Sequence, residues 1–208
     1  MPDLSLEMAL GAADGLLICG VDEVGRGPLA GPVVAAAVIL PAGGLPEGLA
    51  NKINDSKKLS EKQREALYPA LVEHCTYAVA EATVGEIDKI NILHASLLAM
   101  TRAVRQLDPV PHHALIDGNK IPKNLPCPST PVIKGDSSSL SIAAASIIAK
   151  VTRDRIMKAL GAVHTVYGWQ KNAGYGTSLH LEALKTHGVT MWHRGSFAPV
   201  AHAKELTK

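Results

Sequence analysis

The sequence is poor in aromatic residues. Phe, Trp and Tyr together make up 3% of its 208 residues, so the core must be built from Ala, Val, Leu and Ile. This scarcity argues against a platform on which single-stranded bases stack, because such sites need several aromatic faces. Hydrophobic residues still make up 47% of the chain and charged residues 19%, which is typical of a folded globular protein rather than a disordered one.

Cysteine, targeting signals and long apolar runs are also scarce. The three cysteines, Cys19, Cys75 and Cys127, lie far apart without CxxC spacing. They therefore indicate a reducing compartment and neither a disulfide framework nor a zinc site. The first 15 residues carry acids and no basic leader, unlike a secretory signal. Since the longest apolar run is too short to span a membrane, we expect a cytoplasmic protein without a membrane partner.

Charge is nearly balanced overall but unevenly distributed. The net charge of +2 excludes a polycation. Residues 1–50 carry six acids and one base, whereas the rest of the chain carries 20 bases and 13 acids. A basic body around an acidic centre suits a polyanion held to a metal ion. An ordinary mixed surface is the simpler interpretation of charge alone.

Two apolar strands near the N-terminus frame a pair of adjacent carboxylates. Residues 18–21 form an apolar strand that ends in Asp22 and Glu23, and a glycine-rich turn at residues 25–28 leads to the apolar run 33–40. Carboxylates beside a buried strand are unfavourable unless a cation neutralises them. The pattern therefore predicts a divalent metal ion at this strand end.

The rest of the chain alternates between helical and strand patterns. Ser60 and Gln63 fit a capping box at the start of a helix over residues 61–73. Further strands are predicted at 76–84, 114–116 and 132–134, and further helices at 85–91, 92–107, 137–160 and 179–186. Residues 120–131, which contain four prolines, are expected to form a loop, and the tail from 191 to be irregular. This order predicts an α/β fold on a mixed central sheet flanked by helices.

Two more predicted strands end in an acid. Asp117 follows residues 114–116, and Asp136 follows residues 132–134. Because ligands of open α/β sheets gather beyond strand ends, these side chains are expected to meet Asp22 and Glu23 there. Four carboxylates form a hard oxygen cage for Mg²⁺ or Mn²⁺, and two such ions about 3.5–4 Å apart promote phosphoryl displacement. A single Asp in this position is more often a turn former or helix cap, and the four together favour the metal site.

The turn Gly25-Arg26-Gly27 exposes backbone groups with little side chain around them. Such a turn suits close contact with a sugar–phosphate backbone, and its alternative is a plain tight turn. A dinucleotide-binding fingerprint does not fit, because the last glycine falls one residue late and a strand follows where a helix should begin.

Seven motifs in register resemble bacterial ribonuclease HII over about residues 18–200. They are residues 22–28, 54–60, 116–119, 134–136, 143–154, 174–177 and 193–197. The resemblance implies a ribonuclease H-like fold in a single catalytic domain over residues 1–208. Its core would lie at about 18–160, and a small helical C-terminal segment that binds substrate at about 161–200.

The resemblance also implies an activity and a metal site. Such an enzyme cleaves the RNA strand of RNA–DNA hybrids, cuts at single ribonucleotides embedded in duplex DNA, and serves to remove ribonucleotides from DNA. The products would carry a 3′-hydroxyl and a 5′-phosphate. By position, Asp22, Glu23, Asp117 and Asp136 would bind Mn²⁺ or Mg²⁺, with two ions present when substrate is bound. Nothing in the sequence demands more than a monomer.

Substrate contacts follow from the same resemblance. Gly25, Arg26 and Gly27 would sense the 2′-hydroxyl through their backbone, and Tyr175 would pack on the sugar at the RNA-to-DNA junction. The 2′-hydroxyl is the group that distinguishes a ribonucleotide from its deoxyribose neighbours. The candidate phosphate contacts, each with solvated surface as the alternative, are Lys57, Lys58, Lys150, Arg153 and Arg194.

Some positions depart from the family pattern or have no assigned substrate role. Ser138 stands where many relatives have a basic residue, and Asn172-Ala173 where they often have a His-Lys pair, so we expect altered substrate grip rather than lost catalysis. Asp154 is expected in an ion pair or helix packing, and His193 in a structural hydrogen bond, with assistance to proton transfer as the alternative.

Two other function classes remain as alternatives. A non-catalytic binder of RNA–DNA hybrids would not need four acids, because carboxylates repel phosphate unless a cation intervenes. A nucleotide- or dinucleotide-binding enzyme on a related fold is the second alternative.

Overall fold

A computed structural model describes residues 1–206, which divide into two compact units. The first unit comprises residues 1–24, 34–81 and 97–151, and the second comprises residues 25–33, 82–96 and those from 152 onward. The sequence predicted one domain with a C-terminal segment. It contained no sign that two internal segments group with the C-terminal part.

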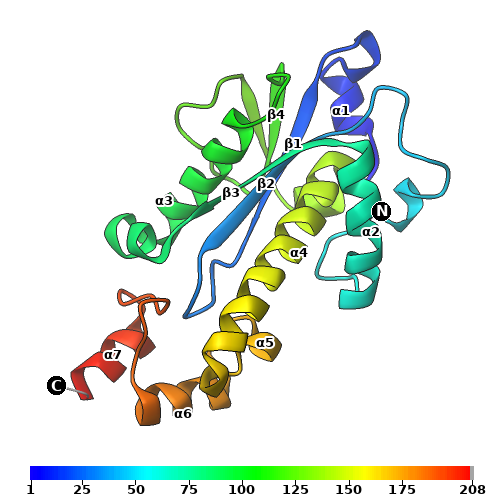
Figure 1. Ribbon diagram of the computed structural model, residues 1–208. Helices are drawn as coiled ribbons and strands as arrows, with labels where there is room; N and C mark the ends of the chain where they lie inside the picture. The colour runs from blue at the N-terminus through cyan, green and yellow to red at the C-terminus, as the bar shows by residue number, and fades with distance from the viewer. Residues whose placement is uncertain (207–208) are drawn as a thin grey trace. The chain divides into compact units, whose positions relative to one another are not determined.

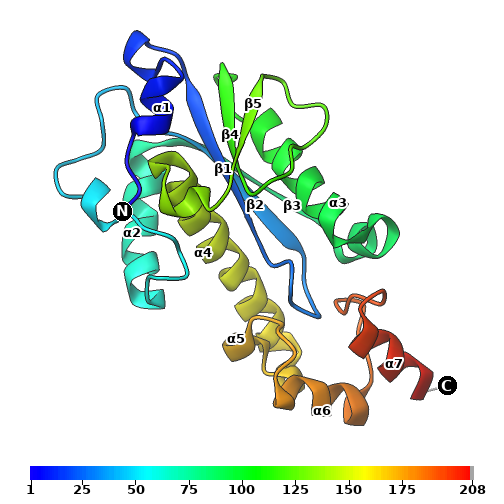
Figure 2. The ribbon, with the colours of Figure 1, turned by 180° about the vertical axis from the view of Figure 1, so that it is seen from behind.

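The strands lie in the first two thirds of the chain, interspersed with helices, and the last third is helical (Figures 1 and 2). The helices are α1 Ser5–Ala9, α2 Glu61–His74, α3 Val84–Arg105, α4 Leu140–Val163, α5 Trp169–Asn172, α6 Ser178–His187 and α7 Ala198–Leu206. The strands are β1 Ile18–Val24, β2 Val33–Ile39, β3 Thr76–Ala82, β4 His113–Asp117 and β5 Ser129–Val132. Over residues 1–206, no helix is both long and apolar enough to cross a membrane.

The strands form one mixed sheet in the order β3-β2-β1-β4-β5, which confirms the predicted fold class. β1 pairs antiparallel with β2 and parallel with β4, and β4 pairs parallel with β5. Val21 lies opposite Ile116 in the register of β1 and β4. Because these two strands run in the same direction, Asp22 and Asp117, one residue further on in each strand, lie near the same end of the sheet.

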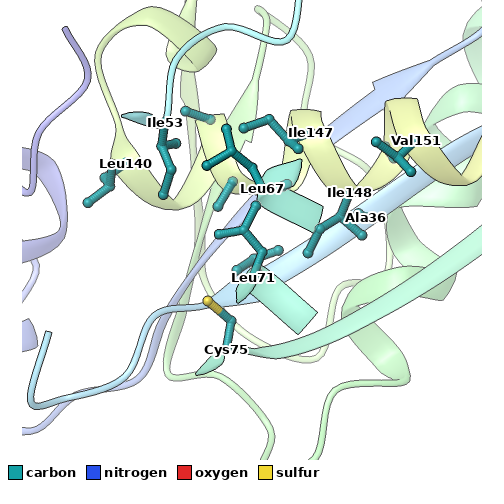
Figure 3. Packing of buried hydrophobic residues seen from close by; sticks show 14 of the residues in the cluster. Ala36, Ile53, Leu67, Leu71, Cys75, Leu140, Ile147, Ile148 and Val151 are labelled. Carbon is teal, nitrogen blue, oxygen red and sulfur yellow. The ribbon is translucent and has the colours of Figure 1, made fainter. Parts of the chain in front are cut away.

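The core of the first unit lies between the sheet and two helices (Figure 3). Ala36 of β2, Leu67 and Leu71 of α2, and Ile147 and Ile148 of α4 are buried together there. The capping box predicted for α2 is confirmed, since the Gln63 amide donates to Ser60 Oγ at 3.3 Å and the Ser60 amide to Gln63 Oε1 at 2.8 Å. The capping box therefore fixes the residue at which α2 begins, and with it the position of the apolar face of the helix.

α4 packs directly on β1 at Gly20. A Cβ added at Gly20 would lie 2.2 Å from both the Ile142 amide nitrogen and the Ser141 carbonyl carbon. No side chain fits at such a distance, so only glycine allows the strand and the helix to approach this closely. Gly20 is two residues before Asp22, and the two residues therefore share one face of the strand.

The predicted boundaries around Asp136 were wrong by a few residues. Residues 135–137 form a 3₁₀ turn, and α4 begins at Leu140 because Ser139 Oγ caps it by accepting from the Ile142 amide at 3.2 Å. β5 covers residues 129–132 rather than 132–134 and therefore falls partly within the predicted loop. Pro131 is tolerated there because β5 is an edge strand.

α3 contains the break expected between two helices, whereas α1 and α7 were not predicted. Asn91, with φ of 65° and ψ of 165°, interrupts the helical run, and its side chain caps the second helical segment by accepting from the amides of Leu93 and His94. α1 has only five residues, too few for a periodic signal. α7 places Val200 and Ala203 in the core of the second unit, a stripe too short to be read from the sequence.

The core of the second unit is built around two aromatic rings. Trp169 is fully buried and stacks on Tyr167, with ring centroids 5.0 Å apart and planes 18° from parallel. Met157, Leu184 and Val200 complete the same cluster. Much of the scarce aromatic content of the chain is therefore used to support one small unit.

Replacing Gly20 by Ala should destabilise the first unit by about 1–3 kcal/mol, because the added methyl group overlaps the backbone of α4. Urea unfolding followed by circular dichroism measures the change. Gly43→Ala is the matched control, since a Cβ at Gly43 meets nothing within 4 Å, and it should change stability by less than about 0.5 kcal/mol. Equal stability of the two variants would contradict the close approach.

Candidate functional site

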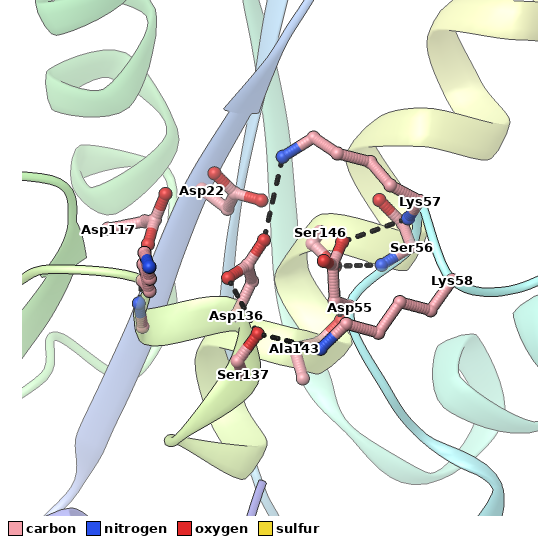
Figure 4. Close-up of polar contacts among 12 residues, drawn as sticks. Asp22, Asp55, Ser56, Lys57, Lys58, Asp117, Asp136, Ser137, Ala143 and Ser146 are labelled. Carbon is pink, nitrogen blue, oxygen red and sulfur yellow. Dashed lines mark hydrogen bonds and ion pairs between the residues drawn. The ribbon is translucent and has the colours of Figure 1, made fainter. Parts of the chain in front are cut away.

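Three carboxylates gather within the first unit (Figure 4). Asp22 ends the apolar part of β1, Asp117 ends β4, and Asp136 lies in the 3₁₀ turn before α4. Asp22 and Asp136 are buried, with 7% and 6% of each residue exposed, and Asp117 is half-buried. The prediction that acids from separate strand ends meet in one place is consistent with this arrangement.

Burial and the neighbouring carboxylates both act against ionisation of Asp22. Burial raises the pKa of its carboxyl group well above the ordinary value, and the charges of Glu23, Asp117 and Asp136 raise it further. The backbone amide of Glu23, which donates to Asp22 Oδ1 at 2.8 Å, offsets part of this increase. A cation at this point would relieve both burial and repulsion, which act against the ionised carboxylate.

Asp117 is tied to the turn that carries Asp136. The Gly135 amide donates to Asp117 Oδ1 at 2.7 Å, so the end of β4 and the start of the turn are linked directly. Burial, followed by the charge of Asp136, raises the pKa of Asp117, while hydrogen bonds from the backbone of Gly135 and Asp136 lower it. Lys134 precedes this turn in a left-handed conformation, with φ of 56°.

The ammonium group of Lys57 lies near the same carboxylates. Its Nζ lies 3.6 Å from Asp136 Oδ2, although its side chain is 81% exposed. Burial lowers the pKa of Lys57, but the combined charges of Asp22, Asp136, Asp55 and Asp117 outweigh burial and raise it overall. This ion pair is solvated and contributes little to stability, so its effect is local.

The loop that carries Lys57 is held by hydrogen bonds on both sides. The Lys57 amide donates to Asp55 Oδ1 at 2.9 Å, and the Ser56 amide donates to Ser146 Oγ of α4 at 3.3 Å. Lys58 Nζ donates to Ser137 Oγ at 3.2 Å. The sequence did not indicate Ser146 as a support, because a serine in an apolar helix gives no signal of its partner.

The donor set fits a hard divalent cation. All the acidic ligands available at this point are carboxylates, which suit Mg²⁺ or Mn²⁺ rather than a softer metal. Within residues 1–206, no three His, Cys, Asp or Glu side chains already stand in the geometry of metal ligands. The carboxylates form a cluster of like charges. Lys57 Nζ lies 3.6 Å from Asp136 Oδ2 in this cluster (Figure 4).

The Gly25-Arg26-Gly27 turn belongs to the second unit and is supported by a buried arginine. Arg194 is fully buried, and its guanidinium donates to the carbonyls of Gly25 at 2.6 Å and Arg26 at 3.0 Å. Gly25 has φ of 95°, which a residue with a side chain rarely adopts. The carbonyls of the turn therefore face the guanidinium.

Arg153 supports the chain on both sides of this region. It is 1% exposed and donates to the carbonyls of Pro32, Ala30 and Ala173 at distances of 2.9–3.0 Å. Burial lowers the pKa of Arg153 to about 10 and that of Arg194 to about 9. The expectation that these two arginines contact phosphate does not fit their burial, because their donors are used by backbone carbonyls. The motifs that contain these two arginines therefore indicate structural support of the backbone rather than phosphate binding.

Tyr175 lies beside Gly27 and is exposed, at 47% of the residue. A Cβ added at Gly27 would come within 3.4 Å of the ring edge, so the glycine leaves room between the turn and the tyrosine. The Leu29 amide donates to the Gly174 carbonyl at 2.8 Å and joins the two segments. Asn172, a departure from the family pattern, accepts from the Gly174 amide at 2.9 Å and so shapes the loop before Tyr175.

Two buried histidines support the same loop, and their hydrogen bonds fix their tautomers. His180 Nδ1 donates to the Tyr175 carbonyl at 2.9 Å, so its Nε2 is an acceptor, reached by Trp169 Nε1 at 3.1 Å. His193 Nδ1 accepts from the Thr190 amide at 2.9 Å, so its Nε2 donates to His180 at 3.1 Å. Both rings are therefore neutral. This agrees with the structural role expected for His193.

The remaining predicted residues differ in their exposure. Arg26 and Gly27 are exposed, and Glu23, Lys150 and Asp154 are half-buried, each of the last three with interactions of its own. The sequence also missed Glu7 and His180, which are buried and hydrogen-bonded to distant residues. Neither stands in a pattern that reveals such partners.

Without metal ions, Asp22→Asn should stabilise the protein at neutral pH. A raised carboxyl pKa means that the native state binds the proton more tightly than the unfolded chain, so stability falls as pH rises above the unfolded value of about 3.9. Asn lacks this penalty, and its advantage should vanish as pH falls towards 4. Thermal unfolding in EDTA from pH 4 to 8 measures it. An advantage that does not change with pH would contradict the assigned repulsion.

Acid should weaken the second unit through His193. Burial, followed by the neighbouring His180, lowers the pKa of His193 to about 3, so the stability that the neutral ring provides is lost as pH falls from about 6.5 towards 3. His193→Gln should make the loss of unfolding free energy over this range less steep than in the wild type. The exposed His202→Gln is the control and should follow the wild-type curve. Identical slopes for all three proteins would contradict a neutral buried ring.

The sequence and the fold both match known proteins. The ribonuclease HII family profile matches residues 19–200. Ribonuclease HII from Ruegeria pomeroyi is 58% identical over 199 residues, which cover 96% of this chain and 83% of the relative. The crystal structure of ribonuclease H2 from Pyrococcus horikoshii OT3 matches with a TM-score of 0.76 and 28% identity, covering 91% of this chain and 98% of that one.

A more distant structure shows the fold alone. Bst-RNase HIII, crystallised in complex with Mn²⁺, matches with a TM-score of 0.74 and 22% identity, covering 95% of this chain and 73% of that chain. The mixed sheet and the flanking helices are therefore those of a ribonuclease H-like fold. From the profile match over most of its length and the high identity to curated relatives, the chain belongs to the ribonuclease HII family of nucleases.

Proposed function

We propose that this nuclease hydrolyses the RNA strand of RNA–DNA hybrids and also cuts at single ribonucleotides embedded in duplex DNA. Cleavage on the 5′ side of the ribonucleotide leaves a 3′-hydroxyl and a 5′-phosphate, and the activity serves to remove ribonucleotides from DNA. The observation that carries the proposal is the meeting of Asp22, Asp117 and Asp136 in the first unit, with Glu23 beside Asp22.

The carboxylates provide the catalytic part. Asp22, Glu23, Asp117 and Asp136 hold Mg²⁺ or Mn²⁺, two ions with substrate bound. The Mn²⁺ complex of the distant Bst-RNase HIII supports this choice of metal. When bound, the metal supplies a Lewis acid that activates water and takes up charge on the leaving oxygen. The Gly135 amide orients Asp117, and the Glu23 amide orients Asp22, so both carboxylates are fixed before substrate arrives.

The turn in the second unit provides recognition of the ribose. Arg194 fixes the carbonyls of Gly25 and Arg26, and Gly27 leaves open space next to the Tyr175 ring. A rigid backbone with free space beside it suits a hydrogen bond to the 2′-hydroxyl, and the ring suits packing on the neighbouring sugar. Lys57 and Lys58 are exposed and Lys150 is half-buried, and all three contribute to phosphate binding.

Asp22→Asn should reduce cleavage of a duplex with one embedded ribonucleotide by at least about 100-fold. Loss of a residue that only orients a metal ligand can already reduce activity by about this factor, and loss of the ligand itself should reduce it at least as much. Binding of the duplex should remain, since Asn keeps the size of the side chain. Gel analysis of end-labelled substrate measures cleavage, and fluorescence anisotropy measures binding. The exposed Glu47→Gln is the control and should cleave as the wild type does.

Two further comparisons separate the proposal from its alternatives. A substrate with deoxyribose in place of the single ribonucleotide should not be cut, and undiminished cutting would refute the role of the 2′-hydroxyl. EDTA should abolish product while leaving hybrid binding measurable. Binding without any metal-dependent product would favour a non-catalytic hybrid-binding protein instead.

A further inference from the structure

A buried glutamate near the N-terminus contacts the start of the longest helix. Glu7 on α1 is 3% exposed, and its Oε1 accepts from Ser139 Oγ and Ser141 Oγ at 2.6 Å each and from the Ser141 amide at 2.9 Å. Its Oε2 is buried without a hydrogen-bond partner among the described residues. A buried carboxylate needs such donors, and the positive end of the α4 dipole adds to their effect.

The backbone reinforces this contact. The Asp3 amide donates to the Ser138 carbonyl at 3.1 Å, and the Leu140 amide donates to the Asp3 carbonyl at 2.9 Å. Residues 138–141 are therefore held by α1 and the segment before it, through both main chain and side chain. The same residues come soon after Asp136, and the amides of Ser138 and Ser139 return to the Gly135 carbonyl at 3.0 and 2.8 Å.

Ser141 also lies against β1. A Cβ at Gly20 would come within 2.5 Å of Ser141 Oγ, so the serine hydroxyl that bonds Glu7 is in contact with the strand that carries Asp22. Glu7 thus holds Ser141 where the strand and the helix meet. This contact helps to set the distance between Asp22 on the strand and Asp136 just before the helix.

We propose that Glu7 is a positioning residue for the carboxylate cluster: it fixes the start of α4 and thereby places Asp136 relative to Asp22 and Asp117. The inference rests on the proposed function, because the placement of these carboxylates affects activity through the metal ion that they bind. Metal ligands must be held to within about 0.5 Å by their supports. Glu7 supplies such support from a segment more than 130 residues away in the sequence.

Mn²⁺ binding to metal-free protein tests the role directly. Calorimetry or electron paramagnetic resonance should show that Glu7→Ala weakens Mn²⁺ binding by about 10-fold, as loss of an outer support does. Glu7→Gln keeps the Oε1 acceptor and should weaken binding less. At low metal concentration kcat should fall and be restored by excess Mn²⁺, while KM for the hybrid stays unchanged. Glu47→Ala, which removes an exposed carboxylate, should bind Mn²⁺ as the wild type does.

A double-mutant cycle with Asp136→Asn separates positioning from general stability. If Glu7 acts through Asp136, Glu7→Gln should weaken Mn²⁺ binding in the wild type but add little once Asp136→Asn is present, because coupled sites are not additive. Should Glu7→Ala not fold, Glu7→Gln and Ser141→Ala provide the same comparison. Full additivity, or a lower unfolding temperature with unchanged Mn²⁺ affinity, overturns the proposal.

The outcomes distinguish this inference from the proposed function. Wild-type Mn²⁺ binding that is lost in Asp22→Asn but unaffected by Glu7→Gln and Ser141→Ala overturns only the role of Glu7. Wild-type protein that binds no Mn²⁺, or binds it equally well with Asp22→Asn, overturns the metal site and with it the positioning role.

Discussion

Repulsion among carboxylates is the constraint that governs the first unit. Asp22 lies within β1, Asp117 ends the parallel strand β4, and Asp136 lies in the 3₁₀ turn before α4. Burial, together with the neighbouring charges, raises the pKa of Asp22 and Asp117. Side chains free to move would separate. They remain close because the sheet fixes Asp22 and Asp117, and a hydrogen bond from Gly135 links Asp117 to the turn of Asp136.

The second unit contains buried positive charge instead of clustered carboxylates. Arg153 and Arg194 would be unfavourable in an apolar interior, but their donors meet backbone carbonyls. Arg194 donates to Gly25 and Gly31, and Arg153 donates to Ala30 and Pro32. The guanidinium groups replace the hydrogen bonds that regular secondary structure provides elsewhere. A pair of neutral histidines then fixes the neighbouring loop through the Tyr175 carbonyl.

Several sites were predictable because their signals are local. The acids of β1 and β4 follow apolar runs within these strands, and Ser60 with Gln63 stands at capping-box spacing. β5 and the start of α4 were misplaced, since proline at a sheet edge and a 3₁₀ turn before a helix both depend on neighbours that the local sequence does not show. Arg153 and Arg194 were predicted to contact phosphate, because no pattern along the chain reveals burial of a charged residue.

The amino-acid sequence alone was enough to establish the fold class, the family and the residue types at the strand ends, because periodicity and motifs act over a few residues. The folded chain was needed to establish that Asp136 meets Asp22, that Ser146 supports the Lys57 loop, and that Glu7 holds the start of α4. These contacts join segments separated by about 90 residues or more. Their partners are chosen by how the sheet and helices pack, since a hydrogen bond of this kind leaves no spacing in the chain.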